Sequence, residues 1–314
     1  MKGMLYTADH HVYELPPLLE WNVRHTGTVP CDSWSVTAVY RPEMAPVLKM
    51  AAGFAAVEDG QTQLRGIVDE YSVELDQNGL TVTLTGRGYA ARLLDNESRP
   101  VTYERVTLRE LLRRHAEPYG ITVGEAVELS SAAPYTAGAG SSQWKVISEF
   151  CRVYGGFLPR FSKTGELLAA PEQAGRQLVL DESSPIRICR LREDHYGVIT
   201  EALVIDKRQN ISYSVRNPEM IRKGGQCRRV VYTPGKSTWA AMRYTGEYQI
   251  QQSRQDEKTV TVSLPGSFGA FPGDRAELRL SKLGLEGFFR VAEAENRFSA
   301  REGAVMTWTL KECE

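Results

Sequence analysis

The sequence predicts an α+β protein that is mostly β, in which two related antiparallel β-barrel modules flank an inserted α+β domain. Three observations lead to this prediction. Residues 1–99 contain runs of alternating apolar and polar residues, the pattern of half-buried antiparallel strands. In residues 100–175 apolar residues recur at helical spacing between short predicted strands. The alternation of apolar and polar residues returns over residues 176–314.

The first module, residues 1–99, has its clearest strands in CDSWSVTAVYRP, LRGIVDEYSVEL and GLTVTLTGR. In the first of these, Trp34, Val36 and Ala38 alternate with polar residues, which predicts that this tryptophan is part of the core. The other two runs are separated by Asn78-Gly79, a strong hairpin signal. We therefore expect a small antiparallel barrel or sandwich.

The middle domain, residues 100–175, begins with a capping box. Thr107 and Glu110 have the spacing at which each side chain satisfies a backbone donor of the other residue, and a helix is expected over 107–117. A short strand follows in GITVGEAVEL and a loop in SAAPYTAGAGSS. A second helix begins near Ser142 and ends at Gly155-Gly156, and a hairpin turns around Lys163-Thr164-Gly165.

The third segment, residues 176–314, is predicted to be a second β-barrel module with one helix, STWAAMRYTGEYQIQQSRQ. Its last strands repeat a feature of the first module. In both, a strand with internal acids (IVDEYSVEL, FRVAEAENRFS) leads through a glycine turn into a strand with threonine on one face (LTVTLTG, VMTWTLK). This loose repeat suggests two related barrels.

Composition narrows the function classes. The 314 residues are 42% hydrophobic and 25% charged, with 38 basic and 39 acidic residues, so no basic surplus indicates nucleic-acid binding. No run has the length of a signal peptide core or a membrane span, and a cytosolic protein without membrane insertion is expected. The five cysteines, at positions 31, 151, 189, 227 and 313, are unclustered and read as reduced thiols rather than zinc ligands.

One nucleotide-binding pattern occurs, because Gly86, Gly88 and Ala91 have the spacing Gly-x-Gly-x-x-Ala. The strand before it alternates instead of being apolar on both faces, and YAARLLDNESRP supports only about two helical turns. Glu104, near the position of a ribose-binding acid, does not end a second buried strand. A structural strand-turn-helix is therefore expected, with no cofactor.

Candidate catalytic residues are few. The candidate acids are Asp69-Glu70, Glu193-Asp194 and Glu293 with Glu295, all in or beside alternating strands where a solvated face is the expected role. Asp9-His10-His11 reads as a solvated turn, and Arg113-Arg114-His115 and Arg228-Arg229 read as surface or interface charges. The segment GSFGAF, residues 266–271, resembles a nucleophile elbow only loosely. We assign no catalytic, cofactor-binding or metal-binding residue.

The order of the segments carries a resemblance. The chain resembles the baseplate hub proteins of contractile phage tails, the late control protein D and Mu-like tail protein family. Four segments carry it, in the family's order: CDSWSVTAVY, TLTGRGYAARLLDNES, SSQWKVISEFCRVYGGFLPRFSKTGELLAAP and FPGDRAELRLSKLGLEGFFRVAEAENRFSA. In that family the Gly-Arg-Gly turn leads out of the first barrel into the α/β unit.

The resemblance implies a structural protein rather than an enzyme. It implies a homo-trimeric, pseudo-sixfold ring that joins the tail tube to the central spike, with tube, spike and tape-measure proteins as partners. The expected location is the bacterial cytoplasm during assembly and then the baseplate of a phage or phage-tail-like particle. Because the sequence stops just after its final strand, no appended muralytic domain is expected. The alternatives are a muralytic or polysaccharide-cleaving tail enzyme, and a carbohydrate-binding module using Trp34, Trp239 or Trp308.

Overall fold

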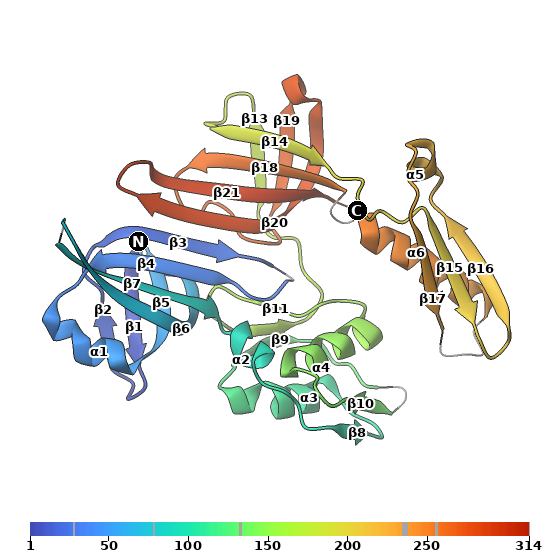
Figure 1. Ribbon diagram of the computed structural model, residues 1–314, viewed down its shortest axis with the longest axis horizontal. Helices are drawn as coiled ribbons and strands as arrows, with labels where there is room; N and C mark the ends of the chain where they lie inside the picture. Colours follow the sequence, from blue (N-terminus) through green and yellow to red (C-terminus); the bar gives the residue numbers. More distant parts are fainter. Residues whose placement is uncertain (28, 78, 132–133, 234–237, 255–256, 314) are drawn as a thin grey trace. The chain divides into compact units, whose positions relative to one another are not determined.

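The computed structural model describes residues 1–27, 29–77, 79–131, 134–233, 238–254 and 257–313. The chain is mostly β, with 48% strand and 20% helix. It forms two compact units (Figure 1). The first comprises Met1–Arg187 and Ser263–Trp308, and the second comprises Ile188–Val262 with the residues from Thr309 onward. The predicted boundaries at residues 99 and 175 remain predictions.

The N-terminal strands form an antiparallel sheet in the order β3-β4-β7-β6-β5-β1-β2. Their bounds are β1 (Lys2–Thr7), β2 (Val12–Glu14), β3 (Leu18–His25), β4 (Ser33–Val39), β5 (Ala51–Glu58), β6 (Gln61–Asp76) and β7 (Gly79–Gly88). Two short helices accompany them, α1 (Ala45–Met50) and α2 (Ala90–Leu94). The alternation in CDSWSVTAVY places Trp34 in the core at 3% exposure, as predicted.

The C-terminal strands repeat this order. The strands are β13 (Gln177–Asp181), β14 (Ile188–Glu193), β18 (Lys258–Pro265), β19 (Arg275–Leu280), β20 (Leu285–Ser299) and β21 (Gly303–Glu312). They pair in the order β14-β18-β21-β20-β19-β13. This order matches the first one strand for strand: β14 takes the place of β3, β18 of β4, β21 of β7, β20 of β6, β19 of β5 and β13 of β1. The matched strands also follow one another in the same order along the chain. The one difference is that β13 runs parallel to β19, whereas β1 is antiparallel to β5.

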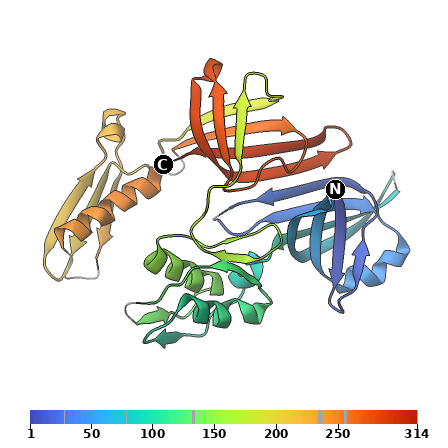
Figure 2. The ribbon, with the colours of Figure 1, turned by 180° about the vertical axis from the view of Figure 1, so that it is seen from behind.

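The two sets of strands join through β20 and β3. Residues 294–298 of β20 pair antiparallel with residues 21–25 of β3, although they are far apart in the chain (Figures 1 and 2). The paired strands thus form one continuous path of hydrogen bonds. The predicted closed barrels are wrong in this respect, because no barrel closes among the described strands. Alternation specifies which face of a strand is buried, but it does not specify where a sheet ends.

The helices predicted for the middle segment are present. α3 (Leu108–His115) begins at a complete capping box, in which the Thr107 hydroxyl accepts from the backbone N–H of Glu110 and the Glu110 carboxylate accepts from that of Thr107. α4 (Gln143–Phe150) is capped by Ser142. The short strands are β8 (Val101–Tyr103), β9 (Val123–Ala126), β10 (Tyr135–Ala137), β11 (Arg160–Phe161) and β12 (Leu167–Ala169). The buried side chains of both helices, Phe150 of α4 among them, pack in one hydrophobic core together with Leu93 of α2.

The second unit has its own three-stranded sheet, in the order β16-β15-β17 (Figure 2). Its elements are β15 (Glu201–Asp206), β16 (Ile211–Arg216), α5 (Pro218–Arg222), β17 (Arg228–Tyr232) and α6 (Trp239–Arg254). The helix packs on the sheet at Gly246, where an added Cβ would lie 2.9 Å from the Cβ of Val215. This close approach explains a glycine that lowers helix propensity by about 1 kcal/mol relative to alanine.

Some elements escaped the sequence analysis. The strands β1, β2, β3 and β5 were not singled out, and β10 lies in the segment predicted as a loop. The predicted Asn78-Gly79 turn lies partly outside the described residues, since Asn78 is not described. Gly79 itself has φ +122°, which favours glycine.

The Gly-x-Gly-x-x-Ala segment is the end of β7 followed by the five-residue helix α2. Gly86 is needed for close packing rather than for a positive φ. An added Cβ would lie 2.6 Å from Cζ2 of Trp34 and closer still to the carbonyl oxygen of Ile67. Trp34 donates to that same carbonyl from Nε1 at 3.1 Å and stacks on Phe54 with ring centroids 3.8 Å apart. The motif therefore lets two strands and an indole meet.

We expect Gly86→Ala to lower the unfolding free energy by about 1–3 kcal/mol, because the methyl group overpacks Trp34 and the β6 backbone. Urea unfolding followed by tryptophan fluorescence measures the loss. Gly138→Ala is the matched control, since the atom nearest to its added Cβ is Ser141 Oγ at 3.8 Å. Equal midpoints for the two variants would contradict the packing role of Gly86.

Candidate functional site

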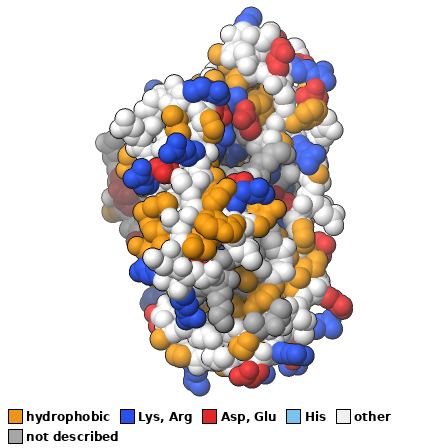
Figure 3. All heavy atoms as spheres, turned by 90° about the vertical axis from the view of Figure 1, so that its right-hand side faces the viewer, with side chains coloured by type: hydrophobic (Ala, Val, Ile, Leu, Met, Phe, Trp, Pro, Cys, Tyr) orange, Lys and Arg blue, Asp and Glu red, His pale blue; other side chains and the backbone are white. Residues whose placement is uncertain are grey.

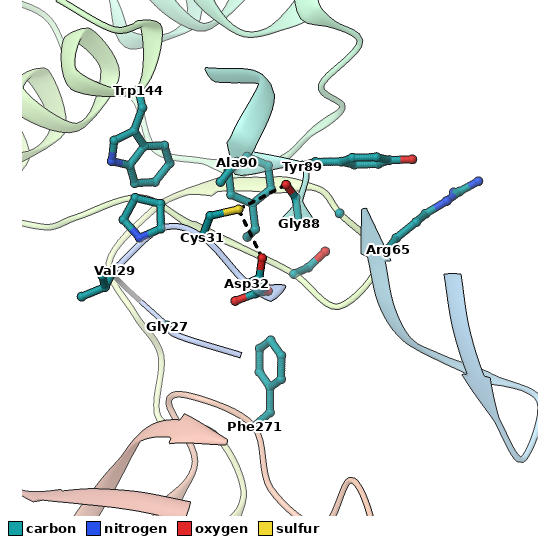
Figure 4. A pocket seen from close by; sticks show the side chains of 14 residues that line it. Gly27, Val29, Cys31, Asp32, Arg65, Gly88, Tyr89, Ala90, Trp144 and Phe271 are labelled. Carbon is teal, nitrogen blue, oxygen red and sulfur yellow. Dashed lines mark hydrogen bonds between the residues drawn. The ribbon is translucent and has the colours of Figure 1, made fainter. Parts of the chain in front are cut away.

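A small pocket lies beside the Gly86–Gly88 segment, between the loop before β4 and the start of α2 (Figure 4). Cys31, Asp32, Tyr89, Trp144 and Phe271 are among its lining residues. Its volume is about 20 Å³, enough for about one water molecule. Small-molecule sites usually enclose several hundred Å³, so this pocket has no room for a dinucleotide.

The pocket is lined by Cys31 and Asp32, and Asp32 pairs with His25 behind the pocket wall. His25 is buried, and its Nδ1 lies 3.2 Å from Oδ2 of Asp32. The Cys31 thiol donates to the carbonyl oxygens of Gly88 and Asp32, at 3.3 Å each. Burial and the neighbouring Asp32 charge raise the pKa of Cys31 to about 11. A nucleophilic cysteine needs a lowered pKa, so this thiol is suited to packing instead.

Three of the four predicted acids of the first unit, Asp69, Glu293 and Glu295, form pairs with nearby cations or amides. Asp69 accepts two hydrogen bonds of 2.8 Å from Arg87, which also binds Asp95. Glu293 accepts from Arg24 at 2.6 Å, and Glu295 accepts from Asn22 at 2.7 Å. The last two contacts cross the β20–β3 junction, so these acids hold two strands together.

Glu193 and Asp194 lie in the second unit. The backbone N–H of Tyr196 and the Arg192 side chain lower the pKa of Asp194, which keeps it ionised at neutral pH. A general acid needs the opposite shift. Glu193 lines a wider pocket of about 540 Å³ whose walls are charged.

The walls of this wider pocket are tied together by ion pairs. Lys223 lies 3.2 Å from Glu257 and 3.3 Å from Glu219, and Arg254 lies 2.8 Å and 3.0 Å from the same two acids. The hydrogen bond from Lys223 and the charge of Arg254 lower the pKa of Glu219. The charges on these side chains largely neutralise one another, and the arrangement is that of a structural ion-pair network.

The predicted basic groups have separate roles. His115 is buried and sits between Gln143, at 2.6 Å from Nδ1, and Tyr103, at 3.0 Å from Nε2. Burial lowers its pKa, so the neutral ring joins α3 to its neighbours. Arg228 pairs with Glu201 across β17 and β15 at 2.7 Å. The Asp9 carboxylate lies 3.0 Å from His11 in an exposed turn.

The tryptophans do not form a carbohydrate platform. Trp34 and Trp308 are buried, and the exposed Trp239 meets Tyr213 edge-on at 62°.

Hydrophobic side chains gather near the middle of the face drawn in Figure 3, next to Lys and Arg. Among the described residues no cluster of His, Cys, Asp and Glu could hold a metal ion. Within the same residues no helix is long and apolar enough to cross a membrane.

Sequence reasoning missed two strand edges. Residues 61–67 of β6 pair with β5, but no described strand pairs with the same edge beyond them, and Asp69–Asp76 is exposed throughout. β14 is the terminal strand of the sheet and has one neighbour, β18. The signal in the sequence was the alternation of apolar Val73 and Leu75 with polar residues. In the structure these two apolar side chains are 43% and 75% exposed, as at a strand edge that has no partner strand.

We expect Cys31 to react with iodoacetamide at least about 100-fold more slowly than the exposed Cys313 at pH 8, because a thiol with a pKa near 11 is about 0.1% thiolate there. The rate at Cys31 should rise about tenfold per pH unit up to pH 10. Mass spectrometry of the alkylated peptides measures both rates. A Cys31 rate that levels off near pH 7 would indicate an activated thiol and contradict the packing role.

Comparison with known proteins supplies the fold relationship. No protein-family model matches the chain, and no curated protein matches it. Among solved structures, the tail protein from Neisseria meningitidis MC58 is similar with a TM-score of 0.80 and 16% identity, over 99% of this chain and 96% of that one. The 43 kDa tail protein of prophage MuSo2 from Shewanella oneidensis is similar with a TM-score of 0.79 and 14% identity, over 99% and 97%.

A third similar structure belongs to a secretion system. A component of the Escherichia coli type VI secretion system, described as similar to the phage T4 tail proteins gp27 and gp5, has a TM-score of 0.56 and 10% identity, over 95% of this chain and 74% of that one. Identities this low establish the fold alone. Over nearly its full length, the chain has the fold of Mu-like prophage tail proteins.

Proposed function

We propose that the chain is a structural baseplate hub of a phage tail or phage-tail-like particle. Three copies form a pseudo-sixfold ring that joins the tail tube to the central spike. The observation that carries this proposal is the near full-length likeness to two prophage tail proteins, at TM-scores of 0.80 and 0.79. The repeated strand order supports it, because a chain with two similar modules presents six similar surfaces when three copies surround an axis.

The domain division is part of this proposal. Residues 1–99 form one module, residues 100–175 an inserted α+β domain, and residues 176–314 a second module that carries β15 to β17 and α6. Two related modules on either side of an insertion is the arrangement expected of a duplicated chain. In the proposed ring the three copies surround a central channel, and the inserted domain, residues 100–175, lies outside it.

The proposed partners are the tail tube, central spike and tape-measure proteins, together with two further copies of the chain. The formal charge of −1 gives no reason to expect sequence-specific nucleic-acid binding. The proposed location is the bacterial cytoplasm during assembly and the baseplate afterwards.

Deleting the gene in the bacterium that produces the particle tests this function. We expect no complete tails, restored by a plasmid copy, because tube and spike lose their connector. Immunogold electron microscopy of an epitope-tagged chain should label the baseplate end of the tail. Intact tails without the chain, or label along the whole tube, would contradict the proposal.

A hydrolase assay tests the competing enzyme hypothesis. We expect no release of soluble fragments from peptidoglycan or capsular polysaccharide by the purified chain, since five of its six candidate acids form ion pairs or hydrogen bonds. Turnover that disappears in Glu193→Ala or Asp194→Ala, while folding is retained, would replace the structural proposal by the muralytic one.

A further inference from the structure

The two modules can be aligned residue by residue at their longest strands, β6 and β20. β6 has a bulge between Val68 and Glu70, where its register with β7 shifts. β20 interrupts its alternation at the same place, because Val291 and the next residue are both buried. These two irregularities align Val68 with Val291 and Glu70 with Glu293. Beyond the bulge, Val73 and Leu75 then correspond to Asn296 and Phe298.

The strands β3 and β14 can be aligned in the same way. β14 runs antiparallel to β18, because Arg187 N–H binds the Ser263 carbonyl at 2.8 Å at one end and Asp194 N–H binds the Glu257 carbonyl at 2.7 Å at the other. The buried residues alternate along β18 as they do along β4. Carrying the β3–β4 register over to β14 and β18 aligns Cys189 with Trp21, Leu191 with Val23, and Arg192 with Arg24.

Within one chain, β20 and β3 form a junction with both backbone and side-chain contacts. Asn296 lies opposite Val23 and Phe298 opposite Trp21, and the Phe298 and Trp21 rings stack at 6.2 Å. On the other face, Arg24 binds Glu293 at 2.6 Å.

The equivalent junction, β6 with β14, is not formed within the described chain. Both of its edges carry exposed apolar residues, Val73 at 43% and Leu75 at 75% on β6, and Leu191 at 39% on β14. The glutamate and arginine of the β20–β3 ion pair are repeated as Glu70 and Arg192. Exposed strand edges with apolar side chains are templates for pairing with another chain.

We propose that β6 of one copy pairs antiparallel with β14 of a second copy. In this register Val73 lies opposite Leu191, Leu75 lies opposite Cys189, and Glu70 binds Arg192, as Glu293 binds Arg24 in the internal junction. The proposal rests on the ring of the proposed function and names the surfaces that close it. Three copies then alternate three internal and three intermolecular junctions.

Charge favours a second copy as the occupant of these edges. The β6 segment from residue 69 to 76 carries four acids and no base: Asp69, Glu70, Glu74 and Asp76. β14 carries two bases, Arg190 and Arg192, and one acid, Glu193, and a third base, Arg187, directly precedes it. Because the two edges are different, the contact is head-to-tail, and a head-to-tail contact forms a ring when its rotation closes after a whole number of copies, three in the proposed hub. Arg192 exchanges its present partner, Asp194, for Glu70 of the neighbouring copy.

Leu75→Cys tests the register with a single substitution, because its partner Cys189 is already present. Directly opposed residues of an antiparallel pair have Cα atoms about 4.5–5.5 Å apart, within the range that a disulfide spans. The purified full-length variant is oxidised over a concentration series and analysed by non-reducing electrophoresis and mass spectrometry. Glu74→Cys is the matched control, since its side chain points to the opposite face of β6.

We expect Leu75→Cys to yield covalent dimers and trimers linked through residues 75 and 189, about tenfold more than Glu74→Cys. Adding Cys189→Ser should abolish them. Yields no higher than those of Glu74→Cys at every concentration would overturn the pairing, and so would links through any other cysteine. A ladder extending beyond three chains would overturn the closed ring.

A charge exchange gives a second readout without oxidation. Glu70→Arg or Arg192→Glu alone should weaken self-association about fivefold by mass photometry, and the double variant should recover it, because each interface then holds the reversed pair. A double variant as weak as either single variant would count against the contact. If the chain is found at the baseplate but Leu75→Cys does not cross-link, the pairing fails and the hub function stands. If Leu75→Cys cross-links but the chain is not found at the baseplate, the hub function fails and the pairing stands.

Discussion

The antiparallel pairing of β20 with β3 is the interaction on which the rest of the molecule depends. β20 is 15 residues long, and β19 occupies one edge only at residues 285–290. The remainder of that edge would expose unpaired N–H and C=O groups, and β3 satisfies them at residues 294–298. A long strand that serves two partners along one edge therefore links the N-terminal strands to the C-terminal strands. β6, at 16 residues, is built in the same way but has only the first partner.

Close packing and charge pairing around this frame account for most residues that resemble functional groups. Gly86 admits the Trp34 indole and the β6 backbone, Gly88 lies against Asp32, and Arg87 between the two glycines binds Asp69 and Asp95. His115 and Cys31 are held by burial in the forms suited to packing, the neutral ring and the protonated thiol. The proposed connector function would need this kind of interior, because a hub must keep its shape while partners bind to its surface.

The strands and helices that the sequence predicted are those with strong local signals. The capping box at Thr107 and the alternation around Trp34 both depend on neighbours within a few residues, and both are present. The open sheet was not predictable in this way, since the partner of residues 294–298 lies more than 250 positions away in the chain. The strands β1 and β3 were missed because their patterns are weak. The echo between IVDEYSVEL and FRVAEAENRFS was visible as a repeat, but only the strand order of the structure shows which of the two lacks a partner.

Electron cryomicroscopy of the assembled hub, alone or at the end of a tail, would show directly whether β6 of one copy pairs with β14 of the next. We expect six strand junctions around the axis, with residues 294–298 against 21–25 within each chain and residues 71–75 against 189–193 between neighbouring chains. A hub in which the edges of β6 and β14 face solvent, or pair with a different protein, would contradict this expectation.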